Sequence, residues 1–151
     1  MTIADRIQRV EMFPVPRERV WDAITKPEQL SQWFGIVRDM DFRVGGEITF
    51  TWEQERSPYP GIIEVIEPPH RFAFRWNSYA IGHPELGLAP SPMTLVELTL
   101  DEIAGGTRLI LVESGFASLS EVIQAAQASQ DNQGGWQVGL SALRSYLQMQ
   151  G

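Results

Sequence analysis

Residues 134–149 sort their apolar and polar side chains onto separate sides of a helix. At about 100° per residue, Trp136, Leu140, Leu143 and Leu147 lie within about 60° of one another. Other apolar or small residues widen this face to about 200°, namely Val138, Gly139, Ala142, Tyr146 and Met149. A helix that is apolar over more than half of its circumference needs a partner that wraps it, and a curved sheet supplies enough concave surface. The pattern therefore predicts a sheet that grips this helix, with room for a pocket between them.

The segments before this helix alternate between apolar and polar residues, which predicts an antiparallel sheet. We expect seven strands, at residues 7–13, 39–44, 47–53, 62–66, 72–76, 94–100 and 108–114. The alternation is clearest in three triplets that mark a buried face, Ile48/Phe50/Trp52, Phe72/Phe74/Trp76 and Val96/Leu98/Leu100. Gly45-Gly46 predicts a two-residue hairpin turn, whereas residues 67–71 and 102–106 predict longer connections.

Two short helices are predicted after the first strand. Residues 20–24 hold one apolar set at helical spacing, and Thr25-Lys26-Pro27 separates it from a second set that includes Trp33 and Phe34 and ends at Gly35. Two connections fall outside this plan. Residues 77–92 are punctuated by Pro and Gly, and residues 116–133 hold a weakly amphipathic stretch. We expect these two connections to form the entrance to the pocket.

The composition fits a single domain over residues 1–151, long enough to bury a sizeable core. The net charge is −7, and the whole acidic excess lies in residues 44–151. Nucleic acid and anionic bilayers are bound mainly through Lys and Arg, so both are disfavoured as partners. The chain has no cysteine, which excludes disulfides, thiolate metal sites and cysteine nucleophiles. It has no apolar run long enough to insert into a membrane and no signal-peptide pattern at residues 1–13, so we expect a cytoplasmic protein.

Five segments, taken in order, resemble one protein family. They are VPRERVWDAITKPEQLSQWF (15–34), FRVGGEITF (42–50), GIIEVIEPPHRFAFRW (61–76), GGTRLILVESGF (105–116) and GGWQVGLSALRSYL (134–147). The order of the elements is similar to the helix-grip fold of the START-like superfamily, also called SRPBCC. The segments resemble its branch related to the C-terminal domain of the activator of Hsp90 ATPase (AHSA1-like).

This resemblance implies an α+β helix-grip fold, a seven-stranded antiparallel sheet wrapped around a long C-terminal helix, with two short helices after strand 1. It also implies a deep apolar cavity between sheet and helix. Members of the superfamily include lipid and hormone carriers, polyketide cyclases and many bacterial proteins. An Hsp90-type chaperone is a partner that the family name suggests. The sequence, however, shows no separate amino-terminal domain, the part that carries much of the chaperone contact in that family.

Aromatic and leucine side chains are the first candidates for lining the cavity, because they supply apolar area with defined geometry. The cavity candidates are Trp33, Phe50, Trp52, Phe74, Trp76, Trp136, Leu140 and Leu143. Simple core packing is the alternative for each of them, since a buried sheet face needs large apolar residues in any case. The two interpretations overlap in this fold, where the wall of the cavity is also the core.

Polar candidates are few. His83 and Glu85 lie two residues apart in residues 77–92 and could form a polar pair at the cavity mouth, although a Gly-His-Pro turn explains the segment without any function. His70 follows Pro68-Pro69 and is interpreted as a turn residue. Two ligands from one loop are a poor metal signature, so we expect no metal site and no cofactor.

Charged residues within the predicted strands differ in their phase relative to the apolar neighbours. Arg75 and Glu97 are out of phase with the buried triplets, which predicts cross-strand ion pairs on the outer face, whereas Glu64 lies between Ile63 and Val65 and is not assigned to a face. Glu113 ends the run from Leu109 to Val112 and is harder to place. If Glu113 points inward, it becomes a candidate acid, base or ligand anchor.

The sequence thus favours a soluble, bacterial-type protein that binds a small hydrophobic molecule, a lipid being one example, in the cavity. Two alternatives stay open. One is a cyclase, dehydratase or hydrolase that uses the same cavity, with catalytic residues unassigned. The other is a co-chaperone-like interaction domain. A charged side chain that projects inward without a protein partner would favour catalysis, and a uniformly apolar lining would favour binding alone. The oligomeric state and the identity of the ligand are not specified by these patterns.

Overall fold

The computed structural model describes residues 6–34, 36–51, 59–76, 93–115 and 136–149. The described elements are, in chain order, β1 (Arg6–Phe13), α1 (Arg17–Thr25), α2 (Pro27–Trp33), β2 (Ile36–Met40), β3 (Glu47–Thr51), β4 (Tyr59–Glu67), β5 (Arg71–Trp76), β6 (Thr94–Ile103) and β7 (Gly106–Ser114). A last helix, which we call the C-terminal helix, covers residues 136–149.

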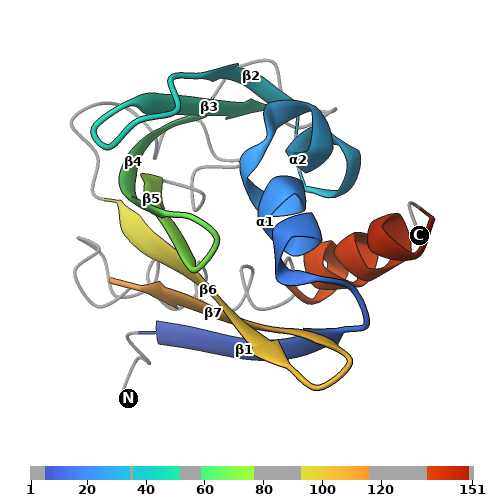
Figure 1. Cartoon of the computed structure of the whole chain (residues 1–151). Helices are drawn as coiled ribbons and strands as arrows, with labels where there is room; N and C mark the ends of the chain where they lie inside the picture. Colours follow the sequence, from blue (N-terminus) through green and yellow to red (C-terminus); the bar gives the residue numbers. More distant parts are fainter. Residues whose placement is uncertain (1–5, 35, 52–58, 77–92, 116–135, 150–151) are drawn as a thin grey trace.

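The seven strands form one antiparallel sheet in the order β1-β7-β6-β5-β4-β3-β2. Strands β2 to β7 are sequential neighbours, and β1 joins the sheet beside β7. The two short helices α1 and α2 carry the chain from one edge strand to the other. Figure 1 shows a curved sheet with α1, α2 and the C-terminal helix (red) on its concave side. This arrangement confirms the predicted α+β helix-grip fold.

Register shifts in two strands accompany the curvature. β2 has one between Val37 and Asp39, and β4 has one between Ile63 and Val65. An extra residue in one strand of an antiparallel pair bends that strand and increases its twist. The shifts therefore suit a sheet that must curve around helices.

The two glycine pairs differ from the predicted turns. β2 ends at Met40 and β3 begins at Glu47, so the predicted two-residue turn at Gly45-Gly46 is wrong and the connection covers residues 41–46. Within it, backbone hydrogen bonds run from Gly45 N to Ile63 O (2.7 Å) and from Ile63 N to Gly46 O (2.9 Å), which ties the connection to β4.

The tight hairpin lies instead between β6 and β7. Ile103 pairs with Gly106, which leaves only Ala104 and Gly105 in the turn, where a longer connection was predicted. Gly105 has φ of +82°, a conformation that the second residue of such a turn needs and that side-chain-bearing residues rarely adopt.

The C-terminal helix is buried along a narrower stripe than predicted. Trp136, Leu140, Leu143 and Leu147 are at most 3% exposed. Two residues of the predicted 200° face, Val138 (72% exposed) and Met149 (84% exposed), instead point to solvent, so that width was wrong. The helix is held on one side, for example by hydrogen bonds from Arg19 to Leu147 O and from Arg144 to Glu11 (2.7 Å). The apolar face that the sequence shows is thus wider than the face of the C-terminal helix that is buried in the structure.

The outer face of the sheet carries cross-strand ion pairs, as predicted. Arg75 donates to Glu64 at 3.0 Å, and Arg71 donates to Glu97. The hydrogen bond to Glu97 raises the pKa of Arg71 above its ordinary value, and burial opposes the rise only in part. These side chains are partly exposed, so each ion pair contributes little to the stability of the fold. Their exposure agrees with a position on the outer face of the sheet.

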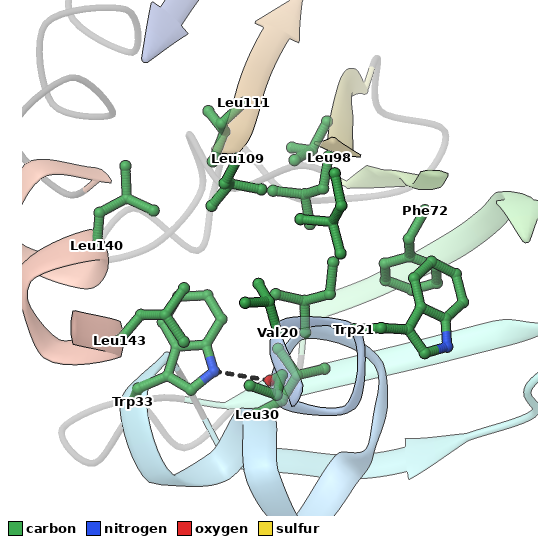
Figure 2. Close-up of a cluster of buried hydrophobic side chains, with 14 of the residues drawn as sticks. Val20, Trp21, Leu30, Trp33, Phe72, Leu98, Leu109, Leu111, Leu140 and Leu143 are labelled. Carbon is green, nitrogen blue, oxygen red and sulfur yellow. Dashed lines mark hydrogen bonds between the residues drawn. The ribbon is translucent and has the colours of Figure 1, made fainter. Parts of the chain in front are cut away.

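The inner face is packed with apolar side chains from every layer. Figure 2 shows Val20 and Trp21 of α1, Leu30 and Trp33 of α2, Leu98, Leu109 and Leu111 of the sheet, and Leu140 and Leu143 of the C-terminal helix meeting in one cluster. None of the described helices combines the length and the apolar character needed to cross a membrane.

Candidate functional site

A buried carboxylate lies under the start of the C-terminal helix. Glu113 is the penultimate residue of β7, and its exposed fraction is 0%. One carboxylate oxygen, Oε1, accepts a hydrogen bond from the indole Nε1–H of Trp136 at 2.8 Å. The other, Oε2, accepts from the indole Nε1–H of Trp76 at 2.8 Å and from the hydroxyl of Thr94 at 2.6 Å. We call these four residues the Glu113 cluster.

Strand phase explains why Glu113 points inward. On β7, Thr107, Leu109, Leu111 and Glu113 are all buried, because successive residues of a strand alternate between faces. Glu113 pairs with Ile7 of β1 and Val96 of β6, so it lies on a strand with a neighbour on each side, one strand in from the β1 edge of the sheet. Its position was therefore readable from its spacing to Leu109 and Leu111.

The Glu113 cluster joins the ends of the two long connections. Trp76 is the last residue of β5 before residues 77–92, and Thr94 opens β6 and pairs with Trp76 across the strands. Glu113 precedes residues 116–135 by a few positions, and Trp136 is the first residue of the C-terminal helix. The carboxylate of Glu113 thus connects β7 to β5, β6 and the C-terminal helix by hydrogen bonds. The residues involved are close in sequence to the two connections predicted to form the pocket entrance.

An aromatic group surrounds these indoles. Phe34, the residue that caps the C-terminal end of α2, stacks on Trp136 with ring centroids 5.2 Å apart and planes 10° apart. Its ring also lies 5.4 Å from the ring of Trp76 and 5.4 Å from that of Phe50. Trp33 adjoins Phe34 at 5.5 Å. With Phe74, which contacts Phe50 and Trp76, these rings make up what we call the aromatic cluster: Trp33, Phe34, Phe50, Phe74, Trp76 and Trp136.

The predicted cavity candidates are largely brought together. Seven of them are buried, and they belong to the aromatic cluster or pack beside it in the core: Trp33, Phe50, Phe74, Trp76, Trp136, Leu140 and Leu143. Trp52, His83 and Glu85 lie outside the described residues. His70 is exposed in the β4–β5 turn, as its turn interpretation predicted, and its Nδ1 lies 3.2 Å from the guanidinium of Arg17.

Two members of the site were missed by sequence reasoning. Thr94 is in phase with Val96 and Leu98, which would have placed it on the inner face, but a single threonine gives no sign of its partner. Phe34 was assigned to the apolar side of α2 and not to the cavity wall, because its contacts come from β3, β5 and the C-terminal helix, all distant in sequence.

The chemistry available here is that of an apolar wall around one acceptor group. Among the described residues, two indoles and one hydroxyl donate hydrogen bonds to the carboxyl oxygens of Glu113. Within the part of the chain that the structure describes, no group of three or more His, Asp or Glu side chains is placed to hold a metal ion. A separate open pocket of about 530 Å³ lies elsewhere, between residues 14–17 and 102–106, and contains none of the predicted site residues.

Comparison with known proteins defines the class. The sequence matches the family described as activator of Hsp90 ATPase homolog 1-like protein over residues 14–148. The match covers most of the chain and agrees with the helix-grip fold and with the resemblance found in the sequence. The chain belongs to this family.

Solved structures share the fold at low sequence identity. DynU16, from the dynemicin biosynthetic locus, superimposes with a TM-score of 0.74 at 24% identity, over 96% of this chain and 48% of that one. This chain therefore spans about half of DynU16. MLL2253 from Mesorhizobium loti gives a TM-score of 0.76 at 20% identity, over 97% of this chain and 98% of that one.

A third structure, NE0264 from Nitrosomonas europaea, gives 0.74 at 19% identity, with both chains covered completely. At these identities the likeness establishes the fold alone. None of the curated proteins compared with this chain is similar enough to count as a match.

Proposed function

We propose that this protein binds a small hydrophobic molecule between the sheet and the C-terminal helix. The observation that carries the proposal is the aromatic cluster built against a buried carboxylate. Large rings supply apolar contact area at low entropic cost, and a single polar group at the edge of such a wall can orient a ligand. The sequence predicts residues 77–92 and 116–133 as the entrance, and the cluster includes Trp76 and Trp136, which lie close to these two connections in the chain.

Binding would draw its free energy from apolar burial, at about 25 cal/mol per Å² before the costs of ordering are subtracted. The described side chains of the core are closely packed around the C-terminal helix (Figure 2). A ligand therefore has to move one or more of them, and the net affinity depends on how little that movement costs.

A catalytic role for the same site has one observation in its favour, since Glu113 is an acidic residue on the inner face. Its carboxylate is already engaged by Trp76, Thr94 and Trp136. A group so engaged is better suited to hold the wall in place than to exchange protons with a substrate, so we favour binding over catalysis.

An interaction domain of the co-chaperone type predicts exposed apolar residues outside a filled core. Phe42 (45% exposed) and Val44 (60% exposed) lie in the connection between β2 and β3 and fit that description. Both residues lie in one short connection, and we treat chaperone binding as the second candidate function.

Native mass spectrometry of the gently purified protein tests the proposal, with a denatured sample as the control. We expect an excess mass of a few hundred daltons that disappears on denaturation. Trp136→Ala removes one wall of the site and should abolish the excess mass, whereas Val138→Ala, on the exposed side of the same helix, should retain it. Circular dichroism confirms that both variants fold. A reproducible apo mass in the wild type, or an excess mass that survives Trp136→Ala, would refute binding at this site.

A further inference from the structure

The aromatic cluster contains one ring that differs from the others in burial. Trp33, Phe50, Phe74, Trp76 and Trp136 are between 0% and 6% exposed. Phe34 is only partly buried, although it contacts four of these five rings. Phe34 is therefore the most exposed ring of the aromatic cluster.

The tryptophans are fixed by polar bonds that a phenyl ring cannot make. The indole of Trp33 donates to the carbonyl oxygen of Ala23 at 2.8 Å (dashed in Figure 2), and those of Trp76 and Trp136 donate to Glu113. Moving any of these indoles would leave a buried donor without an acceptor, which is unfavourable. Phe34 has no polar side-chain atom, so its ring can leave at the cost of apolar contact alone.

The place that Phe34 occupies has the shape of an aromatic ring. Trp136 lies nearly parallel to it, at 10°, and Trp76 is tilted by 30°, with centroids 5.2 and 5.4 Å away. Phe50 meets the same ring edge-on, at 85°. Offset-stacked and edge-to-face arrangements are the ones that pairs of aromatic rings prefer. A flat ring fits these three neighbours better than a puckered or branched aliphatic group of equal volume.

From this geometry, and resting on the proposed function above, we propose that Phe34 holds the position of a ligand's aromatic ring. The protein then takes a planar aromatic molecule, which stacks on Trp136 and Trp76 after the Phe34 side chain has turned away. Phe34 acts as a placeholder whose displacement lowers the affinity.

The test uses 2-naphthol as the probe and its saturated counterpart, decahydro-2-naphthol, as the matched non-aromatic probe. Isothermal titration calorimetry measures both affinities for the full chain. We expect the wild type to bind 2-naphthol at least about tenfold more tightly than the saturated alcohol. Phe34→Ala removes the placeholder and should tighten 2-naphthol binding about tenfold, which corresponds to about 1.4 kcal/mol. Equal binding of the two probes, or no gain in Phe34→Ala, would overturn the proposal.

A general effect of making a hole in the core has to be separated from removal of the placeholder. Phe72→Ala is the matched control, because Phe72 is a fully buried ring of the same core that contacts Trp21 and Phe74 and none of the ligand positions argued above. Its affinity for 2-naphthol should equal that of the wild type. A gain as large as that of Phe34→Ala would show that any cavity suffices, and would refute the special role of Phe34.

Two further measurements guard against misfolded variants and against confusion with the proposed function. In the wild type, intermolecular nuclear Overhauser effects from 2-naphthol should reach the indole protons of Trp76 and Trp136, and contacts confined to other residues would contradict the proposal. If native mass spectrometry finds an aliphatic ligand and 2-naphthol does not bind, the proposed function stands and the aromatic ligand class is wrong. If no small molecule binds at all, both are wrong.

Discussion

Replacing Glu113 with glutamine should lower the free energy of unfolding more than so small a chemical change suggests. The side chain keeps its size, but one acceptor oxygen becomes an NH₂ donor. If the amide oxygen faces Trp136, the new NH₂ group faces the indole N–H of Trp76 and the hydroxyl of Thr94. The hydroxyl can rotate and accept, whereas the indole can only donate. With the amide reversed, the indole of Trp136 loses its acceptor instead.

Either orientation leaves one buried indole donor facing another donor. Loss of an acceptor for a buried donor costs about 1–3 kcal/mol, so we expect Glu113→Gln to lower the free energy of unfolding by about that amount. The assay is urea denaturation followed by far-UV circular dichroism, with an unchanged slope indicating that the folded state is intact.

Glu97→Gln is the control for this prediction. It makes the same chemical change on the neighbouring strand, but on the outer face, where the Glu97 side chain is 28% exposed and pairs with Arg71. A partly exposed pair of this kind contributes about 1 kcal/mol or less.

A second check is Trp136→Phe. It should lower the free energy of unfolding less in the Glu113→Gln background than in the wild type, because the two changes remove one shared interaction. If Glu113→Gln were as stable as the wild type, or more stable, the carboxylate would not be holding the indoles, and a catalytic or ligand-binding task for it would gain weight.

Two further predictions concern the fold. Leu143→Ala, at a fully buried position of the C-terminal helix, should lower the free energy of unfolding by about 2–5 kcal/mol. Val138→Asp, on the exposed side, should change it by about 0.5 kcal/mol or less. Urea unfolding of both variants measures the difference, and equal effects would refute the one-sided burial of this helix. Gly106→Ala should destabilise the protein more than Gly105→Ala, because a Cβ at 106 would lie 2.0 Å from the backbone oxygen of Phe13, while a Cβ at 105 meets open space and bears only the strain of its φ of +82°. Thermal unfolding of the two variants ranks them, and the reverse order would contradict the close approach of β1 to this turn.

The sequence predicts those residues of the candidate site that are marked by a local periodic pattern. Alternation of period two identified Phe50, Phe74 and Trp76 as inward-facing, and helical spacing did the same for Trp136, Leu140 and Leu143. Such patterns report which face of an element is apolar, because burial follows the periodicity of the backbone.

The contacts among these residues join segments that are far apart in the sequence, so they could not be predicted from local patterns. Glu113 was an inward-facing candidate of unknown purpose until Trp76, Thr94 and Trp136 were seen to converge on it from β5, β6 and the C-terminal helix. Phe34 caps the C-terminal end of α2, and its place among Phe50, Trp76 and Trp136 depends on how α2 ends against the sheet.

The order of the elements, the inward faces of the strands and the family follow from short-range periodicity and from segments that match in order, so all three are readable in the sequence. The covered width of the C-terminal helix, the glycine pair of the tight turn and the partners of Glu113 emerge only when the chain is folded. Those outcomes depend on contacts between residues far apart in the chain, for example the 133 positions between Glu11 and Arg144, and such contacts leave no period in the sequence.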